Sequence, residues 1–147
     1  MAMSSALPAP TVAEALRMDL IVEARCICCW AFAELGVPCE VHHLTVGGKH
    51  GAPRRGHAFT LGICTWHHRG NWDYATWDAI GRPASPPYAV AMVGPSYART
   101  PSLFRSTFGD DEALLVLQSR ILADRAATYL ISRGRYADPT LPGGLSP

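Results

Sequence analysis

The fold depends on two short stretches of sequence, Cys26-Ile27-Cys28-Cys29 and Cys64-Thr65-Trp66-His67. Each stretch places two zinc-ligand side chains with two residues between them, a spacing that lets both reach one tetrahedral ion. Four protein ligands leave no open position on the ion, so such a site is structural, and its binding energy contributes to folding. The sequence therefore predicts a structural Zn²⁺ ion held by Cys26, Cys29, Cys64 and His67.

Two ligand choices stay open at this point. Cys28 could replace Cys26 in the set, and His68 could replace His67, because Cys64 can share a helical face with either histidine. The chain has five Cys residues, an odd number, and four of them lie between Cys26 and Cys39. In a reducing compartment this clustering favours metal binding over disulfides.

The composition is that of one ordinary soluble domain. The chain has 147 residues, of which 48% are hydrophobic and 17% are charged. The first ten residues carry no Lys or Arg ahead of an apolar run, and no run of apolar residues is long enough to span a bilayer. These features predict a cytoplasmic protein with no membrane partner.

The formal net charge of +1 hides an uneven distribution of charge. Between Val41 and Trp72 there is no Asp or Glu, and all six His residues fall in the same window. The basic residues of this window are Lys49, Arg54, Arg55 and Arg69. A local basic, His-rich surface of this kind suits a phosphate-bearing substrate.

A strand, a loop, a second strand and a helix are expected between the two ligand pairs and just beyond them. The β-prone segments 39–44 and 59–63 can form a hairpin, and the Gly-rich, basic segment 47–56 is expected to be a mobile loop. Cys26 is expected to begin a turn, and residues 64–70 are expected to open a short helix. This order predicts a small, zinc-stabilised α+β domain.

Two longer helices are expected to flank this core. Thr11 followed by Glu14 is a capping-box signal for a helix over 12–24, and apolar residues at helical spacing predict a second helix over 110–132. Residues 71–100 are expected to be irregular. The predicted organisation is a disordered lead-in over 1–10, one domain over 11–132 with its motif core at 26–70, and a tail over 133–147.

The adjacent pair His42 and His43 suggests metal-assisted hydrolysis. Neighbouring residues on a strand point to opposite faces, so one imidazole can hold a divalent ion while the other removes a proton from water. On the later helix, His68 is rotated by roughly 100 degrees from His67 and could face the strand ends. The chain is therefore expected to have two metal sites, one structural and one catalytic.

The same residues resemble a known family. The motifs that carry the resemblance are Cys26-x-x-Cys29, Glu40-Val41-His42-His43-Leu44, Gly47-Gly48, Gly56-His57-x-x-Thr60 and Cys64-x-x-His67-His68-Arg69-Gly70. They look like the HNH endonucleases with the ββα-metal fold, and are most similar to the phage Ref family of recombination enhancement, RecA-dependent nucleases. The resemblance covers roughly residues 22 to 124.

The resemblance implies roles for individual side chains. His43 would be the general base, His42 and His68 would hold a catalytic Mg²⁺ or Mn²⁺ ion, or a Zn²⁺ ion, and His57 would orient the base. DNA phosphodiesters would be cut to leave a 3′-hydroxyl and a 5′-phosphate. The DNA backbone would be held by Lys49, Arg54, Arg55 and Arg69.

The same resemblance also implies the binding partners and the biological role of the protein. It implies DNA as substrate, a recombinase filament as a partner, and a phage-encoded protein that acts in recombination or DNA processing in the host cytoplasm. The C-terminal helix is the expected contact of any homodimer. The alternative is a non-catalytic zinc module that binds DNA or a protein, in which His42 and His43 complete a second structural site.

Overall fold

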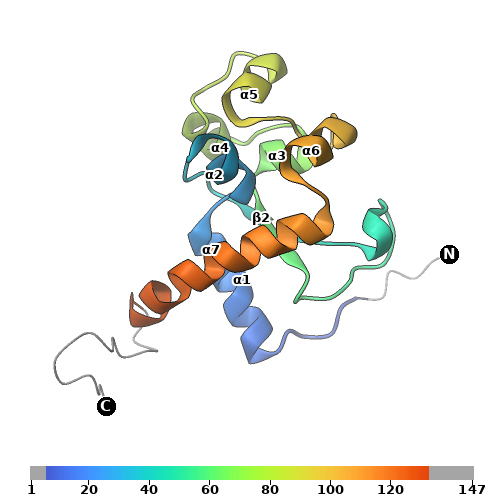
Figure 1. The fold of residues 1–147 in the computed structure, drawn as a ribbon, viewed down its shortest axis with the longest axis vertical. Helices are drawn as coiled ribbons and strands as arrows, with labels where there is room; N and C mark the ends of the chain where they lie inside the picture. Colours follow the sequence, from blue (N-terminus) through green and yellow to red (C-terminus); the bar gives the residue numbers. More distant parts are fainter. Residues whose placement is uncertain (1–5, 133–147) are drawn as a thin grey trace.

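The computed structural model describes residues 6–132, and their fold belongs to the α+β class, as predicted (Figure 1). Two short strands form one antiparallel hairpin, and helices surround it. The elements in chain order are α1 (Val12–Ala24), α2 (Ile27–Ala33), β1 (Glu40–His43), η1 (Val46–Gly48), β2 (Thr60–Ile63), α3 (Thr65–Arg69), α4 (Tyr74–Ala79), α5 (Pro86–Val93), α6 (Pro101–Phe108) and α7 (Asp111–Ser132).

Helix α1 begins at the predicted residue and has the predicted cap. The Thr11 hydroxyl accepts a hydrogen bond from the Glu14 backbone N–H, and the Glu14 carboxylate accepts one from the Thr11 N–H. Both bonds satisfy backbone donors that a helix start leaves without partners. The inner face of α1 is buried in the core and consists of Leu20, Ile21 and Ala24.

The hairpin is confirmed, with Glu40 opposite Ile63 and His43 opposite Thr60. Every residue of β2 is buried, and helices α1 and α7 both pack on this strand. A side chain at Gly62 would not fit, because its Cβ would lie 2.8 Å from a methyl carbon of Ile21 and 3.0 Å from Cys39 Sγ. The glycine therefore allows α1 to pack closely on the hairpin.

The expected turn at Cys26 is instead the start of a helix. Cys26 is the N-cap of α2, and its Sγ accepts a hydrogen bond from the Cys29 backbone N–H. Sulfur is not among the preferred capping groups, so the start of this helix carries no recognisable sequence signal. The helix ends at Glu34, which adopts a left-handed conformation.

Residues 71–100 are more regular than predicted. They form α4 and α5, and α6 follows directly, so the expectation of an irregular segment was wrong. The frequent prolines were misleading, because Pro86 and Pro101 each occupy the first turn of a helix, where no backbone N–H is needed. All three helices are short, six to eight residues long, which leaves little periodicity to detect.

Helix α7 crosses α1 and β2 on one side of the molecule (Figure 1). Leu114, Ile121 and Leu122 are buried, and the fully buried Gln118 accepts a hydrogen bond from the Gly62 backbone N–H at 2.8 Å. The inner face of α7 is therefore covered by its own chain. A homodimer contact through this helix stays a prediction.

The ends of the chain lie partly outside the description. Of the predicted lead-in, residues 1–5 fall outside it, and residues 6–10 have no regular secondary structure. The predicted tail over 133–147 lies entirely outside the described residues. Within the described part of the chain, no helix combines the length and the apolar character needed to cross a membrane.

Candidate metal centre and active site

Four buried side chains converge between α2 and α3, and they are the predicted set Cys26, Cys29, Cys64 and His67. Their candidate ligand atoms all lie within 4.8 Å of one another. The Sγ atoms of Cys29 and Cys64 are 3.7 Å apart, and His67 Nδ1 lies 3.2 to 3.5 Å from the three sulfurs. The structure therefore brings His67 into this cluster, and His68 does not take part in it.

The dimensions of this cluster fit a tetrahedral zinc ion. Bonds of about 2.3 Å to sulfur and 2.0–2.1 Å to nitrogen at tetrahedral angles require about 3.8 Å between sulfurs and about 3.6 Å between sulfur and nitrogen. His67 Nε2 donates a hydrogen bond to the Val93 carbonyl oxygen at 2.9 Å, which leaves Nδ1 with its lone pair facing the sulfurs. The cluster can thus hold a structural metal such as zinc.

The electrostatics of the cluster favour one thiolate, on Cys26. Burial raises the pKa of the Cys26 thiol, but hydrogen bonds from the neighbouring thiols outweigh burial and hold the pKa well below its usual value, whereas the pKa values of Cys29 and Cys64 are raised by their hydrogen bonds to Cys26 and by burial. Zinc binds the thiolate form of cysteine. Helix α5 supports the site, because Val93 and Gly94 accept hydrogen bonds from His67 and from the buried Trp66.

His42 and His68 meet on the other side of α3. Their ring centroids are 4.3 Å apart, and both side chains line one pocket. Burial, together with His68, His43 and Arg54, lowers the pKa of His42 to about 4, so its imidazole is neutral at physiological pH. Burial also lowers the pKa of His68, although Glu40 opposes this shift, and two imidazoles at this separation could serve as ligands for a divalent ion.

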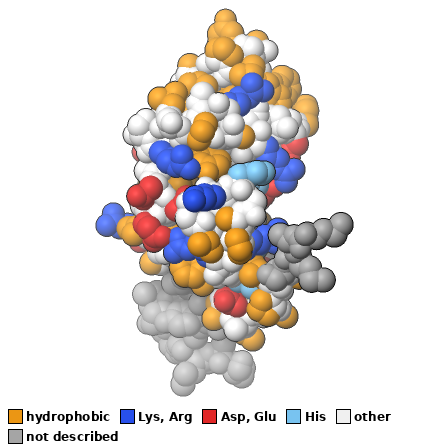
Figure 2. Space-filling view, turned by 90° about the vertical axis from the view of Figure 1, so that its right-hand side faces the viewer, with side chains coloured by type: hydrophobic (Ala, Val, Ile, Leu, Met, Phe, Trp, Pro, Cys, Tyr) orange, Lys and Arg blue, Asp and Glu red, His pale blue; other side chains and the backbone are white. Residues whose placement is uncertain are grey.

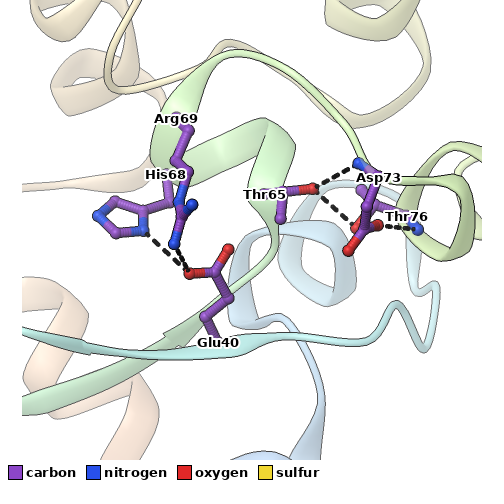
Figure 3. Close-up of polar contacts among 6 residues, drawn as sticks. All are labelled: Glu40, Thr65, His68, Arg69, Asp73 and Thr76. Carbon is purple, nitrogen blue, oxygen red and sulfur yellow. Dashed lines mark hydrogen bonds and ion pairs between the residues drawn. The ribbon is translucent and has the colours of Figure 1, made fainter.

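A carboxylate that the sequence had not singled out contacts this pair. Glu40 Oε2 lies 3.8 Å from His68 Nδ1 and 2.6 Å from Arg69 Nη2, and Figure 3 shows both contacts on one carboxylate oxygen. A carboxylate beside one ring nitrogen favours a proton there and leaves the other nitrogen, Nε2, free for a ligand. The signal was present in the sequence, because Glu40 and His42 lie two apart on one strand and share a face.

Helix α3 is fixed at its other end by a small polar network (Figure 3). The Thr65 hydroxyl donates to the Thr76 hydroxyl at 3.0 Å and accepts from the Asp73 backbone N–H at 3.3 Å. The Asp73 carboxylate in turn caps α4 by accepting from the Thr76 N–H. These contacts join α3 to α4 and limit how far His68 can move.

His43 points away from His42 and toward His57. His43 Nε2 lies 2.9 Å from His57 Nδ1, and His57 Nε2 lies 2.8 Å from the Pro8 carbonyl oxygen. Burial, Arg54 and His57 all lower the pKa of His43, which favours the neutral imidazole. A neutral imidazole can accept a proton.

The four predicted DNA contacts differ in their surroundings. Arg55 pairs with Glu112, and Arg69 pairs with Glu40, both at 2.6 Å. Lys49 and Arg54 have no ion pair with any residue of the described chain. Figure 2 shows histidine side chains at the surface with Lys and Arg side chains close by and acidic side chains on the same face, so this surface is mixed in charge rather than uniformly basic.

Comparison with known families agrees with this geometry. The family model described as "Recombination enhancement, RecA-dependent nuclease" matches residues 10–123, which include both histidine pairs and the cysteine cluster. The chain belongs to this family. Membership supports a nuclease activity in general and DNA as the substrate, and the family description names RecA as the protein on which its nucleases depend. No curated protein and no solved structure matches the chain significantly.

Proposed function

We propose that this member of the RecA-dependent nuclease family is a metal-dependent DNA endonuclease of the HNH type. The observation that carries the proposal is the division of four histidines into two pairs, His42 with His68 and His43 with His57. One pair suits a divalent ion, and the other suits a general base with an orienting partner. Metal-assisted hydrolysis of a phosphodiester needs both.

The hydrogen bonds around His57 support Nδ1 of His43 as the atom that would act as the base. The Pro8 carbonyl oxygen can only accept, so His57 Nε2 carries a proton, and in the neutral ring Nδ1 is then an acceptor. His43 Nε2 must therefore donate to His57 Nδ1. This leaves the lone pair on His43 Nδ1, the atom that would take a proton from the attacking water.

His42 and His68 would hold the catalytic divalent ion, with Mg²⁺ or Mn²⁺ as the first candidates. When bound, such an ion polarises the scissile phosphate and stabilises the charge that develops on the leaving oxygen. Glu40 would orient His68 through its Nδ1 atom. Lys49 and Arg54 would contact the DNA backbone directly, and Arg55 and Arg69 would do so by exchanging their carboxylate partners for phosphate.

The products expected of this reaction carry a 3′-hydroxyl and a 5′-phosphate. A recombinase filament is the proposed partner, since the family description names RecA. A phage origin and a role in recombination or DNA processing in the host cytoplasm fit this partner. The Cys26–Cys29–Cys64–His67 cluster would bind zinc only for stability.

A nicking assay tests the proposal. The purified chain is incubated with supercoiled plasmid and Mg²⁺ or Mn²⁺, alone and with a recombinase-coated oligonucleotide, and the His43→Ala variant serves as control. We expect metal-dependent nicking by the wild type and none by the variant. An absence of nicking under all conditions would instead favour a non-catalytic zinc module that binds DNA or a protein.

A further inference from the structure

A pocket of about 660 Å³ extends from the His42–His68 pair into the body of the molecule. Its volume lies within the range of about 300–1,000 Å³ that is usual for sites binding small organic molecules. Five apolar core side chains, each only 2–4% exposed, form the floor of the pocket, namely Leu44, Leu61, Ile63, Phe104 and Leu114. A phosphodiester at the histidine pair would need little of this space and none of its apolar surface.

The Gly-rich loop lines another part of the pocket and keeps it open. Gly48 and Gly51 both line the pocket and have positive φ angles of 65° and 78°. A Cβ on Gly48 would lie 3.1 Å from Asp111 Oδ2, inside the space between the loop and α7. Glycine here therefore presents backbone rather than side chains to whatever enters the pocket.

A polar cluster lies beside Gly48 in the same pocket. Tyr97 donates a hydrogen bond to the Gly48 carbonyl oxygen at 3.3 Å and accepts one from Arg105 at 3.0 Å. The nearby Asp111 carboxylate lines the pocket, has no hydrogen bond to its side chain within residues 6–132, and is close enough to Arg105 and Arg55 to be attracted by their charges. Tyr97 also packs edge-on against Phe104, with ring centroids 5.5 Å apart.

The charged side chains that line the pocket indicate how a bound nucleotide would be oriented. Arg69 lies beside the histidine pair, where it and a bound metal ion would attract a phosphate, whereas the Asp111 carboxylate lies close to Arg105, so the charges at that end of the pocket are balanced and suit an uncharged group. A nucleobase is uncharged, has apolar faces that pack on aromatic and aliphatic side chains, and carries N–H groups that a carboxylate accepts. A nucleotide with its phosphate at the histidines and its base beside the half-buried Tyr97 and Asp111 satisfies both regions.

We propose that this pocket receives one unpaired nucleobase from the DNA strand that is cut, next to the scissile phosphate. The proposal rests on the proposed function, because the histidine pair defines where the phosphate lies. A base inside a duplex can enter only after it has left its stack and its partner, which costs energy that an unpaired base does not require. The preferred substrate is therefore DNA with an unpaired nucleotide at the cleavage position.

The test compares binding to three DNAs by fluorescence anisotropy, in the His43→Ala background so that the DNA stays intact. The first is a fully paired duplex, the second has one extra unpaired thymidine, and the third has an abasic residue in place of that thymidine. We expect the thymidine bulge to bind about tenfold or more tightly than the abasic bulge. The abasic DNA is the control, because it has the same bulge in its backbone as the thymidine DNA but no base that could enter the pocket.

A matched pair of variants locates the effect. Ala98 is exposed and lines the pocket, so Ala98→Phe would fill the entrance and reduce the preference for the base to near unity. Ala91 is an exposed residue of α5 that does not line the pocket, so Ala91→Phe would leave the preference for the base unchanged. Asp111→Asn, which removes the acceptor charge without adding bulk, would reduce the preference in part. Zinc content and melting temperature verify that each variant is folded.

The outcomes separate this proposal from the nuclease proposal. Equal affinity of the parent protein for the thymidine and abasic bulges would overturn the base pocket, even if the wild type nicks plasmid. A preference that persists in both Ala98→Phe and Asp111→Asn would also overturn it. A clear base preference in a protein that never cuts DNA would instead contradict the nuclease proposal and leave the base-binding pocket standing.

Discussion

His43 and His57 form a directed hydrogen bond, with His43 Nε2 2.9 Å from His57 Nδ1, and the Pro8 carbonyl oxygen fixes its direction from the far side of His57. The carbonyl holds the proton on His57 Nε2, so that His57 can only accept from His43 while its ring is neutral. His57 thereby selects the tautomer of His43. In the proposed mechanism His57 is a positioning residue, since it would act through another side chain.

Replacing His57 therefore tests the tautomer. We expect His57→Ala to lower kcat for DNA nicking by about one to two orders of magnitude with little change in KM, because the DNA contacts remain. His57→Asn places a carboxamide oxygen where it can accept from His43 and should recover much of the lost rate. If both variants lose activity and melting temperature together, His57 is structural rather than positioning.

Removing the proposed base should separate chemistry from stability. His43→Ala should reduce nicking by about 10²- to 10⁴-fold, the usual contribution of a general base. His43 is only half-buried and lies outside the cysteine cluster, so zinc content and melting temperature should stay near the wild-type values. Plasmid nicking, metal analysis and thermal denaturation of the same preparations check this. A large loss of stability would mark His43 as structural.

The sequence predicted the parts of the molecule that are built on strong local signals. The capping box at Thr11 and Glu14 located α1, and the two ligand pairs located the cysteine cluster, because cap and ligand spacings are fixed by bond geometry. It could not choose between His67 and His68. That choice depends on the Val93 carbonyl oxygen, which binds His67 Nε2 from a helix far along the chain.

The missed features depend on contacts that are distant in sequence or on short elements. Helix α5 was overlooked because its prolines resemble loop signals, and α4 because it is only six residues long, although they position the cysteine cluster and α3. The prediction that Arg55 and Arg69 hold the DNA backbone did not foresee their ion pairs with Glu112 and Glu40, which lie outside the window that contains no acidic residues. Charge counted over a window does not show which charges are paired in space.

Glu40 should control how tightly the catalytic ion binds. Glu40→Gln keeps the size of the side chain but removes the charge beside His68 Nδ1, and we expect the metal concentration needed for half-maximal nicking to rise about 10- to 100-fold. Asp78→Asn is the matched control, because Asp78 is in an exposed ion pair with Arg82. A metal titration of activity measures the shift. Equal shifts in both variants would point to a general electrostatic effect.

Loss of one zinc ligand should unfold the domain. We expect Cys29→Ser to lower bound zinc and abolish the cooperative thermal transition, because the cluster joins α2 to α3 and metal binding contributes to folding. Cys28→Ala is the control: Cys28 is also fully buried but is not part of the cluster, so one zinc per chain should remain. Zinc analysis and circular dichroism check both. Loss of zinc in Cys28→Ala would place Cys28 in the ligand set.

Close packing of α1 on the hairpin makes Gly62 intolerant of any side chain. A Cβ there would lie 2.8 Å from Ile21, 3.0 Å from Cys39 Sγ and 3.3 Å from the Arg25 carbonyl oxygen, so α1 would have to shift. We expect Gly62→Ala to lower the free energy of unfolding by about 1–3 kcal/mol. Gly36→Ala is the control, because a Cβ at Gly36 meets nothing within 4 Å. Urea denaturation of both variants measures the difference, and equal stabilities would show that α1 does not pack on β2 as closely as described.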